Sequence, residues 1–319
     1  MQAPESTVNQ SDPAKQSAFS LLRLMRPKQW TKNLIVLAPM LFAAKLHDPQ
    51  LVLNALLCFV AFCLLSSSLY IFNDILDKDA DKLHPIKCRR PISSGEISLA
   101  LAWTLCSILA PAALALSFYV RPTLVLVFVA YLVLNVLYSA VLKHIAIVDV
   151  LTIAMGFLLR AMAGAVAVKV PLSSWFLLCA GLGAIFLALE KRRSELTTLQ
   201  SAADSHRPVL QRYSAALIDR LEGVVLPGLL ISYIFYSFLS IHGQWMMLSV
   251  PFVIYGIMRY QQLSSQNDAS TGAPEDVLLK DRPIQIAIVL WLLTCAGVLY
   301  GVIQHAVQVL VSSMDSLVR

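Results

Sequence analysis

Long apolar runs dominate this chain, and each is long enough to cross the hydrocarbon core of a membrane as an α-helix. Such a helix needs about 20 predominantly apolar residues. The composition agrees, because 58% of the 319 residues are hydrophobic and only 14% are charged, whereas a typical soluble domain has about 25% charged residues. The predicted fold class is therefore all-α, a polytopic membrane protein with nine transmembrane helices near residues 26–46, 50–76, 98–119, 122–142, 147–168, 172–193, 215–241, 244–262 and 284–312.

A polar stretch over residues 1–17 precedes the first predicted helix and lacks the apolar segment of a signal peptide. We expect a flexible tail there, followed by a single nine-helix transmembrane domain over residues 18–319. The tail, every second loop and the adjoining helix ends together hold 20 of the 25 Lys and Arg residues, whereas the opposite side holds only Lys45, Arg121, Lys169 and Arg319. Because Lys- and Arg-rich loops stay in the cytoplasm, we predict a bacterial inner (plasma) membrane protein with its N terminus in the cytoplasm and its C terminus outside.

The second predicted helix ends in a charged stretch, FNDILDKDADKLHPIKCRRPISSG. At about 100° per residue, four of its polar side chains share one face of a continuous helix: Asn73, Asp74, Asp77 and Asp81. Asp79 points elsewhere. Crowded carboxylates repel each other unless a cation lies between them, and hard oxygen ligands suit Mg²⁺. We predict a Mg²⁺ site at these four residues, with the three aspartates as catalytic residues; the alternative is a solvated helix end.

Basic residues on the same predicted side of the membrane are candidates for binding a phosphorylated substrate. Lys87 and Arg90 lie in a loop that contains proline and glycine; the alternative is ordinary charge on a cytoplasmic loop. Lys28 and Lys32, at the start of the first predicted helix, are spaced i, i+4 and are expected to share a face.

Tyr138 and Lys143 end the fourth predicted helix on the same side, where a hydroxyl and an ammonium can bind phosphate oxygens. The alternative is an interfacial tyrosine beside a snorkelling lysine. Arg160 lies near the middle of the fifth predicted helix, and a charge at that depth costs about 2.5–3.5 kcal/mol. We therefore expect Arg160 to be buried against substrate or an acidic partner, or to form a purely structural ion pair.

These motifs together resemble the UbiA superfamily of intramembrane prenyltransferases. The likeness rests on NDxxDxxxD at the end of the second helix and on nine predicted helices, and it implies a diphosphate bound through Mg²⁺ at a cytoplasmic mouth. The segments RPKQWTKN, LYSAVLKH and KRRSEL resemble the polyprenyl-phosphate phosphoribosyltransferase branch. That branch is a group of transferases that move 5-phosphoribose from phosphoribosyl pyrophosphate (PRPP) to a polyprenyl phosphate.

The sequence departs from the wider superfamily where many members carry a second aspartate-rich motif. Here the segment reads ALEKRRSEL, and Lys191, Arg192 and Glu195 are predicted to bind the ribose-phosphate donor. The rival function is prenyl transfer to an aromatic or other neutral acceptor, which needs one polyanion site. A transporter would place its polar site near the midplane, whereas this chain gathers its charge at one face. We expect no nucleic-acid partner, and a homo-oligomer is compatible with the sequence.

Overall fold

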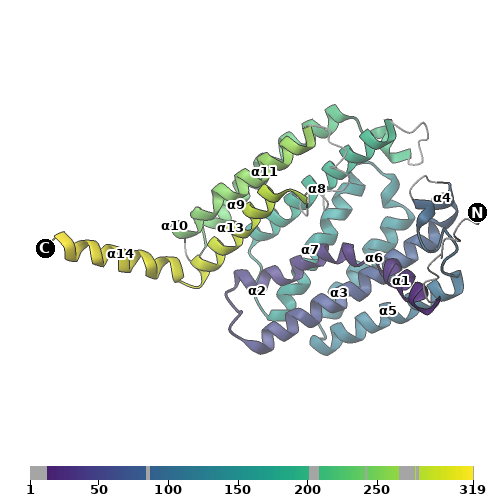
Figure 1. Ribbon diagram of the computed structural model, residues 1–319, viewed down its shortest axis with the longest axis horizontal. Coiled ribbons are helices and arrows are strands. Elements are labelled where there is room, and N and C mark those ends of the chain that lie inside the picture. Colours follow the sequence, from purple (N-terminus) through teal and green to yellow (C-terminus); the bar gives the residue numbers. More distant parts are fainter. Residues whose placement is uncertain are drawn as a thin grey trace, which may run out of the picture. The chain divides into compact units, whose positions relative to one another are not determined.

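The computed structural model describes residues 13–83, 87–200, 208–240, 243–265, 277 and 280–318, and within these residues the regular elements are all helical. Figure 1 shows their course along the chain. The longer helices are α1 (Pro13–Met25), α3 (Pro49–Leu76), α5 (Leu99–Val120), α6 (Leu124–Ala140), α7 (Val148–Val168), α8 (Ser174–Gln200), α9 (Ala215–Phe238), α11 (Val250–Ser265), α13 (Arg282–Leu299) and α14 (Val302–Val318).

Shorter helical segments join them. The 3-10 helix η1 (Pro27–Leu37) leads into α2 (Ala38–Phe42), and α4 (Lys78–Lys82) and η2 (Lys87–Arg89) follow α3. The others are η3 (Leu142–His144), η4 (Pro208–Arg212), α10 (Gly243–Met246) and η5 (Met247–Ser249).

Six of the predicted spans form helices that are long and apolar enough to cross a membrane within the described residues: α3, α5, α7, α8, α9 and α13. The spans expected at 26–46, 122–142 and 244–262 are helical but shorter or divided, as η1 with α2, as α6, and as α10, η5 and α11. Many large apolar side chains face outwards, among them Ile108, Phe118 and Leu126. An apolar surface of this extent suits lipid rather than water.

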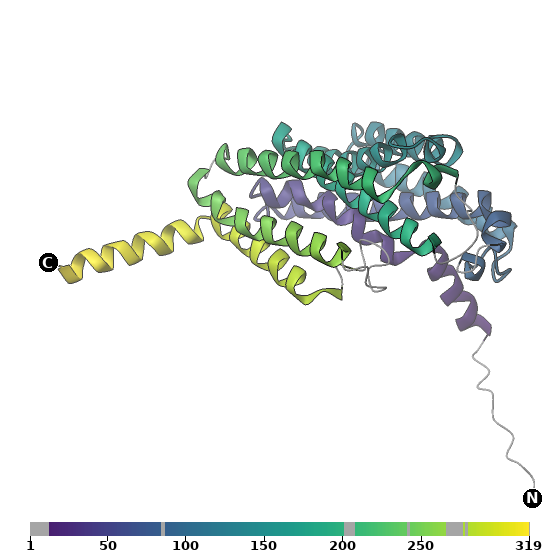
Figure 2. The ribbon, with the colours of Figure 1, turned by 90° about the horizontal axis from the view of Figure 1, so that it is seen from above.

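The expectation of one continuous helix over 284–312 is wrong. α13 ends at Leu299, and α14 starts at Val302 as a separate helix, shown in yellow in Figure 2. Gly301 between them has φ +73°, the left-handed conformation with which helices commonly end at a glycine. α1 begins at Pro13, within the stretch 1–17 for which a flexible tail was expected, and residues 1–12 lie outside the described part of the chain.

The chain divides into two compact units. Unit 1 comprises Met1–Asn33 and Val60–Ala115, and unit 2 comprises Leu34–Phe59 and Leu116–Arg319. In unit 1, Leu24 of α1 packs with Ile71 of α3 and Ala102 of α5. This packing fixes α1 beside the end of α3, where the aspartates lie.

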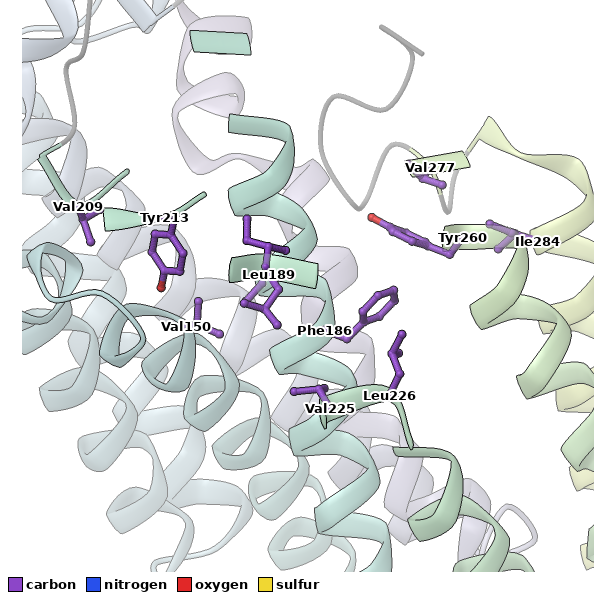
Figure 3. Packing of buried hydrophobic residues seen from close by; sticks show 12 residues of the cluster. Val150, Phe186, Leu189, Val209, Tyr213, Val225, Leu226, Tyr260, Val277 and Ile284 are labelled. Atoms are coloured by element: carbon purple, nitrogen blue, oxygen red, sulfur yellow. The ribbon is translucent and has the colours of Figure 1, made fainter. Parts of the chain in front are cut away.

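Unit 2 is built around α8, which packs along both α7 and α9. Phe186 and Leu189 of α8 lie in a buried cluster with Val150 of α7 and Leu226 of α9 (Figure 3). Tyr213, which precedes α9, belongs to the same cluster. The apolar residues of three helices thus hold the polar end of α8 in place.

Gly164 of α7 lies directly against the backbone of η1 in unit 2. A Cβ at this position would lie 2.0 Å from the Val36 carbonyl oxygen, so only glycine permits this approach.

We expect Gly164→Ala to destabilise the protein by about 1–3 kcal/mol or more, the range for overpacking a close contact. The measurement is the apparent melting temperature of the purified protein in detergent. Gly223→Ala is the matched control, because no heavy atom lies within 4 Å of its added Cβ. Equal melting temperatures for the two variants would contradict the close contact.

Candidate functional site

The end of α3 carries the predicted acidic residues on a nearly continuous helical path. The α-helix is interrupted at Asp77, which has φ −87° and ψ 2°. The helical spacing nevertheless survives, because the Asp77 amide donates to the Asn73 carbonyl at 2.9 Å and the Asp81 amide donates to the Asp77 carbonyl at 2.8 Å. The side chains therefore keep approximately the facing that the sequence predicts.

The aspartates differ in how far they are buried, and the difference agrees with the prediction that Asp79 points away from the shared face. Asp74 and Asp81 are buried, whereas Asp79 is exposed and pairs with Lys82 at the surface, at 3.1 Å. Asp77 is half-buried and accepts a hydrogen bond from the Asn73 amide at 3.0 Å.

The cation between the two buried carboxylates is an arginine. Arg90 Nη1 lies 3.0 Å from Asp74 Oδ1 and 2.5 Å from Asp81 Oδ2. Arg26 Nη2 lies 2.5 Å from the same Asp74 oxygen, and Lys87 Nζ lies 4.0 Å from Asp81 Oδ1. All of these residues belong to unit 1. Two predicted bases, Lys87 and Arg90, thus meet the predicted acids, and Arg26, which was not predicted as a site residue, joins them.

The donor chemistry of this acidic site fits a hard divalent cation. Among the described residues no three His, Cys, Asp or Glu side chains gather around one point. Asp74 and Asp81 nevertheless converge on a single cationic group, and Asn73 and Asp77 lie within one helical turn of them. Carboxylate and amide oxygens are the ligands that Mg²⁺ takes, together with water and substrate phosphate.

A second polar cluster lies in unit 2 around Arg192, and we call it the Arg192 cluster: Tyr138, Asp149, Arg192, Glu195 and Tyr213. Arg192 is only 1% exposed. Its Nε lies 2.8 Å from Asp149 Oδ2, its Nη1 pairs with Glu195, and its Nη2 donates to the Tyr138 hydroxyl at 3.4 Å. Three predicted residues, from α6 and α8, are therefore brought together.

Two members of the Arg192 cluster were not predicted as site residues. Asp149 lies in the first turn of α7, where an acid interacts favourably with the helix dipole, and it is completely buried. Tyr213 donates from its hydroxyl to Asp149 Oδ1 at 2.7 Å (its ring is labelled in Figure 3). Burial, and next its hydrogen bond to Asp149, raise the pKa of the Tyr213 hydroxyl above its ordinary value, so the hydroxyl keeps its proton at neutral pH.

Arg160 is buried in α7, as predicted for a charge at membrane depth. Its Nη2 donates to the Tyr131 hydroxyl at 2.5 Å and its Nη1 donates to the Gly156 carbonyl at 3.0 Å. The guanidinium also lies 4.7 Å from the centre of the Tyr131 ring, a cation–π arrangement. Arg160 therefore contacts a tyrosine and a backbone carbonyl, whereas the sequence predicted contact with substrate or an acidic partner.

The expectation that Lys28 and Lys32 share a face is wrong. Both lie in η1, a 3-10 helix, in which residues i and i+3 align and residues i and i+4 are about 120° apart. Lys32 accordingly bonds to Gln29, three residues earlier, at 2.5 Å, and Lys28 is exposed. In unit 2, Lys143 of η3 and Lys191 of α8 are both half-buried.

The family follows from comparison with known proteins. The sequence model of the UbiA prenyltransferase family matches residues 33–275, so the chain belongs to the UbiA prenyltransferase family and is a transferase. The chain is 33% identical over 304 residues to a decaprenyl-phosphate phosphoribosyltransferase of Mycolicibacterium smegmatis, covering 90% of this chain and 95% of that one. A relative with the same name from Corynebacterium glutamicum is 33% identical, covering 90% and 89% of the two chains.

The fold also matches solved structures. A UbiA homolog from Archaeoglobus fulgidus bound to DMAPP and Mg²⁺ superposes with a TM-score of 0.66 at 20% identity, covering 88% of this chain and 98% of that one. The same protein bound to GPP and Mg²⁺ gives 0.67 at 19% identity, with 88% and 99% covered. The described chain therefore has the UbiA fold.

Removing Arg90 leaves Asp74 and Asp81 close together without their shared cation. We expect Arg90→Met to destabilise the protein by about 1–3 kcal/mol, because the two buried carboxylates lose the cation between them and, within the described residues, keep only Arg26 and Lys87 as charged partners. The control is Arg89→Met, which removes the same charge from an exposed neighbour. The measurement is the apparent melting temperature in detergent, and equal values for the two variants would argue against the bridging role of Arg90.

Proposed function

We propose that this transferase moves the 5-phosphoribosyl group of PRPP to a polyprenyl phosphate and releases pyrophosphate. The observation that carries the proposal is that the chain's second polar cluster is centred on arginine, not on aspartates. A mixed cluster of acids and bases suits a sugar phosphate better than a second metal-bound diphosphate does. The names of the relatives that match nine-tenths of the chain support the same reaction.

In this proposal, Asn73, Asp74, Asp77 and Asp81 hold Mg²⁺, and the three aspartates are the catalytic residues. When bound, the ion neutralises the pyrophosphate of PRPP and makes it a better leaving group. Arg26 and Arg90 already point their donors at this place, and arginine binds phosphate through paired hydrogen bonds. The acidic site therefore supplies both the ligands for the metal and the donors for the phosphate oxygens.

The reaction itself needs little proton transfer. A lipid phosphate is already ionised at neutral pH, so its oxygen attacks C1 of the ribose without a general base. The C1–O bond to pyrophosphate breaks as the new C1–O bond forms on the opposite face, and the product is inverted at C1. Catalysis then consists mainly of holding two anions together and stabilising the developing charge.

The other predicted site residues fall into two groups in this proposal. Tyr138, Lys143, Lys191 and Glu195 are proposed to contact the ribose phosphate of the donor. Because Arg192 is buried and already paired with two carboxylates, we assign it to this group through the side chains that it holds. Lys28, Lys32 and Lys87 are proposed to contact phosphate at the membrane surface, and Arg160 to hold α7 in place through its contacts with Tyr131 and Gly156. One catalytic domain over residues 18–319 would contain all of them.

We expect Asp77→Asn to lower turnover by at least about a hundredfold, because a metal ion supplies several kcal/mol of charge stabilisation. Asp79→Asn is the matched control and should stay within about twofold, since Asp79 is exposed and lies off the shared face. The assay incubates the purified protein with PRPP and polyprenyl phosphates and detects the lipid product by mass spectrometry. EDTA should stop the wild-type reaction and Mg²⁺ should restore it.

A product formed from a prenyl diphosphate and an aromatic acceptor, with none from PRPP, would instead establish the rival prenyltransferase function. An Asp79→Asn variant as inactive as Asp77→Asn would contradict the assignment of the shared face.

The proposed donor is cytosolic, so the acidic site should face the cytoplasm. The alternation of Lys and Arg between loops predicts this orientation. We expect a reporter that is active only in the periplasm to be silent when fused after residue 95 and active when fused after residue 319. Periplasmic activity after residue 95 would refute both the orientation and the use of a cytosolic donor.

A further inference from the structure

Ile147 occupies an unfavourable backbone conformation immediately before α7. Its φ is 70°, and a β-branched residue with positive φ is a genuine outlier that costs free energy. The Ile147 amide, which lies at the start of α7, donates to the Tyr213 hydroxyl at 2.7 Å. The surrounding structure thus holds a strained residue in place through one tyrosine.

The hydrogen bonds continue from Tyr213 into the Arg192 cluster. The Tyr213 hydroxyl donates to Asp149 Oδ1, and Asp149 Oδ2 accepts from Arg192 Nε. Tyr213 and Asp149 lie 64 residues apart in sequence and Asp149 and Arg192 lie 43 apart. Both Asp149 oxygens are therefore engaged, each by a different element, and the carboxylate has a fixed orientation.

Arg192 in turn contacts and orients two residues of the proposed donor site. With Nε fixed by Asp149, its planar guanidinium directs the other two nitrogens towards Glu195 and Tyr138. A buried ion pair contributes little net stability compared with apolar residues of similar size. Strain at one end of a hydrogen-bonded chain and proposed substrate contacts at the other indicate a role in positioning.

We propose that Tyr213 and Asp149 are positioning residues, which act through Arg192 to hold Glu195 and Tyr138 in the orientation needed for the phosphoribosyl donor. The inference rests on the proposed function, because it takes Glu195 and Tyr138 as donor contacts. Neither Tyr213 nor Asp149 needs to touch the substrate.

The test compares Tyr213→Phe with Tyr233→Phe. Both changes remove one buried tyrosine hydroxyl with two hydrogen-bond partners, Ile147 and Asp149 for Tyr213 and Ser249 and Trp291 for Tyr233. Because the two changes are matched in this way, losses caused only by reduced stability should be similar in the two variants. Tyr233 lies away from the Arg192 cluster, because most of α9, about 30 Å along a helix axis, separates it from Tyr213.

The first readout is amide hydrogen exchange in a peptide covering residues 141–149, which needs no enzymatic activity. We expect faster exchange in Tyr213→Phe than in wild type or Tyr233→Phe, because the Ile147 amide loses its acceptor. Unchanged exchange would overturn the hydrogen-bonded chain whatever reaction the protein catalyses.

The second readout is kinetic. We expect Tyr213→Phe and Asp149→Asn each to lower kcat/KM for PRPP by about tenfold to a hundredfold, with the KM for polyprenyl phosphate unchanged. Combining Tyr213→Phe with Glu195→Gln should cost less than the product of the two single effects, because residues that act as a unit are not additive. Tyr233→Phe combined with Glu195→Gln should be additive.

Equal kinetic losses in Tyr213→Phe and Tyr233→Phe would overturn the positioning role, even if the exchange result holds. A wild-type protein that makes no product from PRPP refutes the proposed function, and the hydrogen-exchange result then shows separately whether the contacts exist.

Discussion

The bridge that Arg90 makes between Asp74 and Asp81 is the interaction on which the acidic site depends. Both carboxylates are buried, and the repulsion between two anions grows as the surroundings become less polar. Their approach is possible because one guanidinium nitrogen contacts both and Arg26 adds a second positive charge at Asp74. Arg90, directly after η2, lies against Asp74 at the end of α3, and the packing of α1 on α3 brings Arg26 to the same carboxylate.

The Arg192 cluster meets the same constraint with the charges reversed. The buried Arg192 contacts Asp149, Glu195 and the Tyr138 hydroxyl, and the Tyr213 hydroxyl donates to Asp149. In the acidic site, two buried acids instead meet one arginine. Low polarity makes each contact strong and makes any unpaired member costly. In both clusters the charged side chains are therefore held by several partners at once, and charges held in this way can stabilise charge that develops in a reaction.

The parts that follow from local periodicity were predictable from the sequence. Six spans and the shared facing of Asp74 and Asp81, with Asp79 exposed, depend only on helix geometry and hydropathy. Lys28 and Lys32 were misjudged because the sequence does not distinguish a 3-10 helix from an α-helix. The break at Gly301 was overlooked because the apolar pattern continues across it. Asp149 and Tyr213 could not be assigned, since their partners are distant in sequence and become neighbours only through packing.

The ion pairs between acids and arginines limit the positive charge that unit 1 can offer to a bound phosphate. An arginine bound to two carboxylates has no excess positive charge to offer, so a phosphate would gain little from approaching the pair alone. If the aspartates held a divalent cation, as proposed, Arg26 and Arg90 would be free to turn their donors towards phosphate oxygens. Each charge would then exchange one partner for another, which would avoid the desolvation penalty of leaving a buried charge unpaired. Under the proposed function, the aspartates and arginines of unit 1 would act as one interdependent set, and metal and phosphate would bind there more strongly together than either would alone.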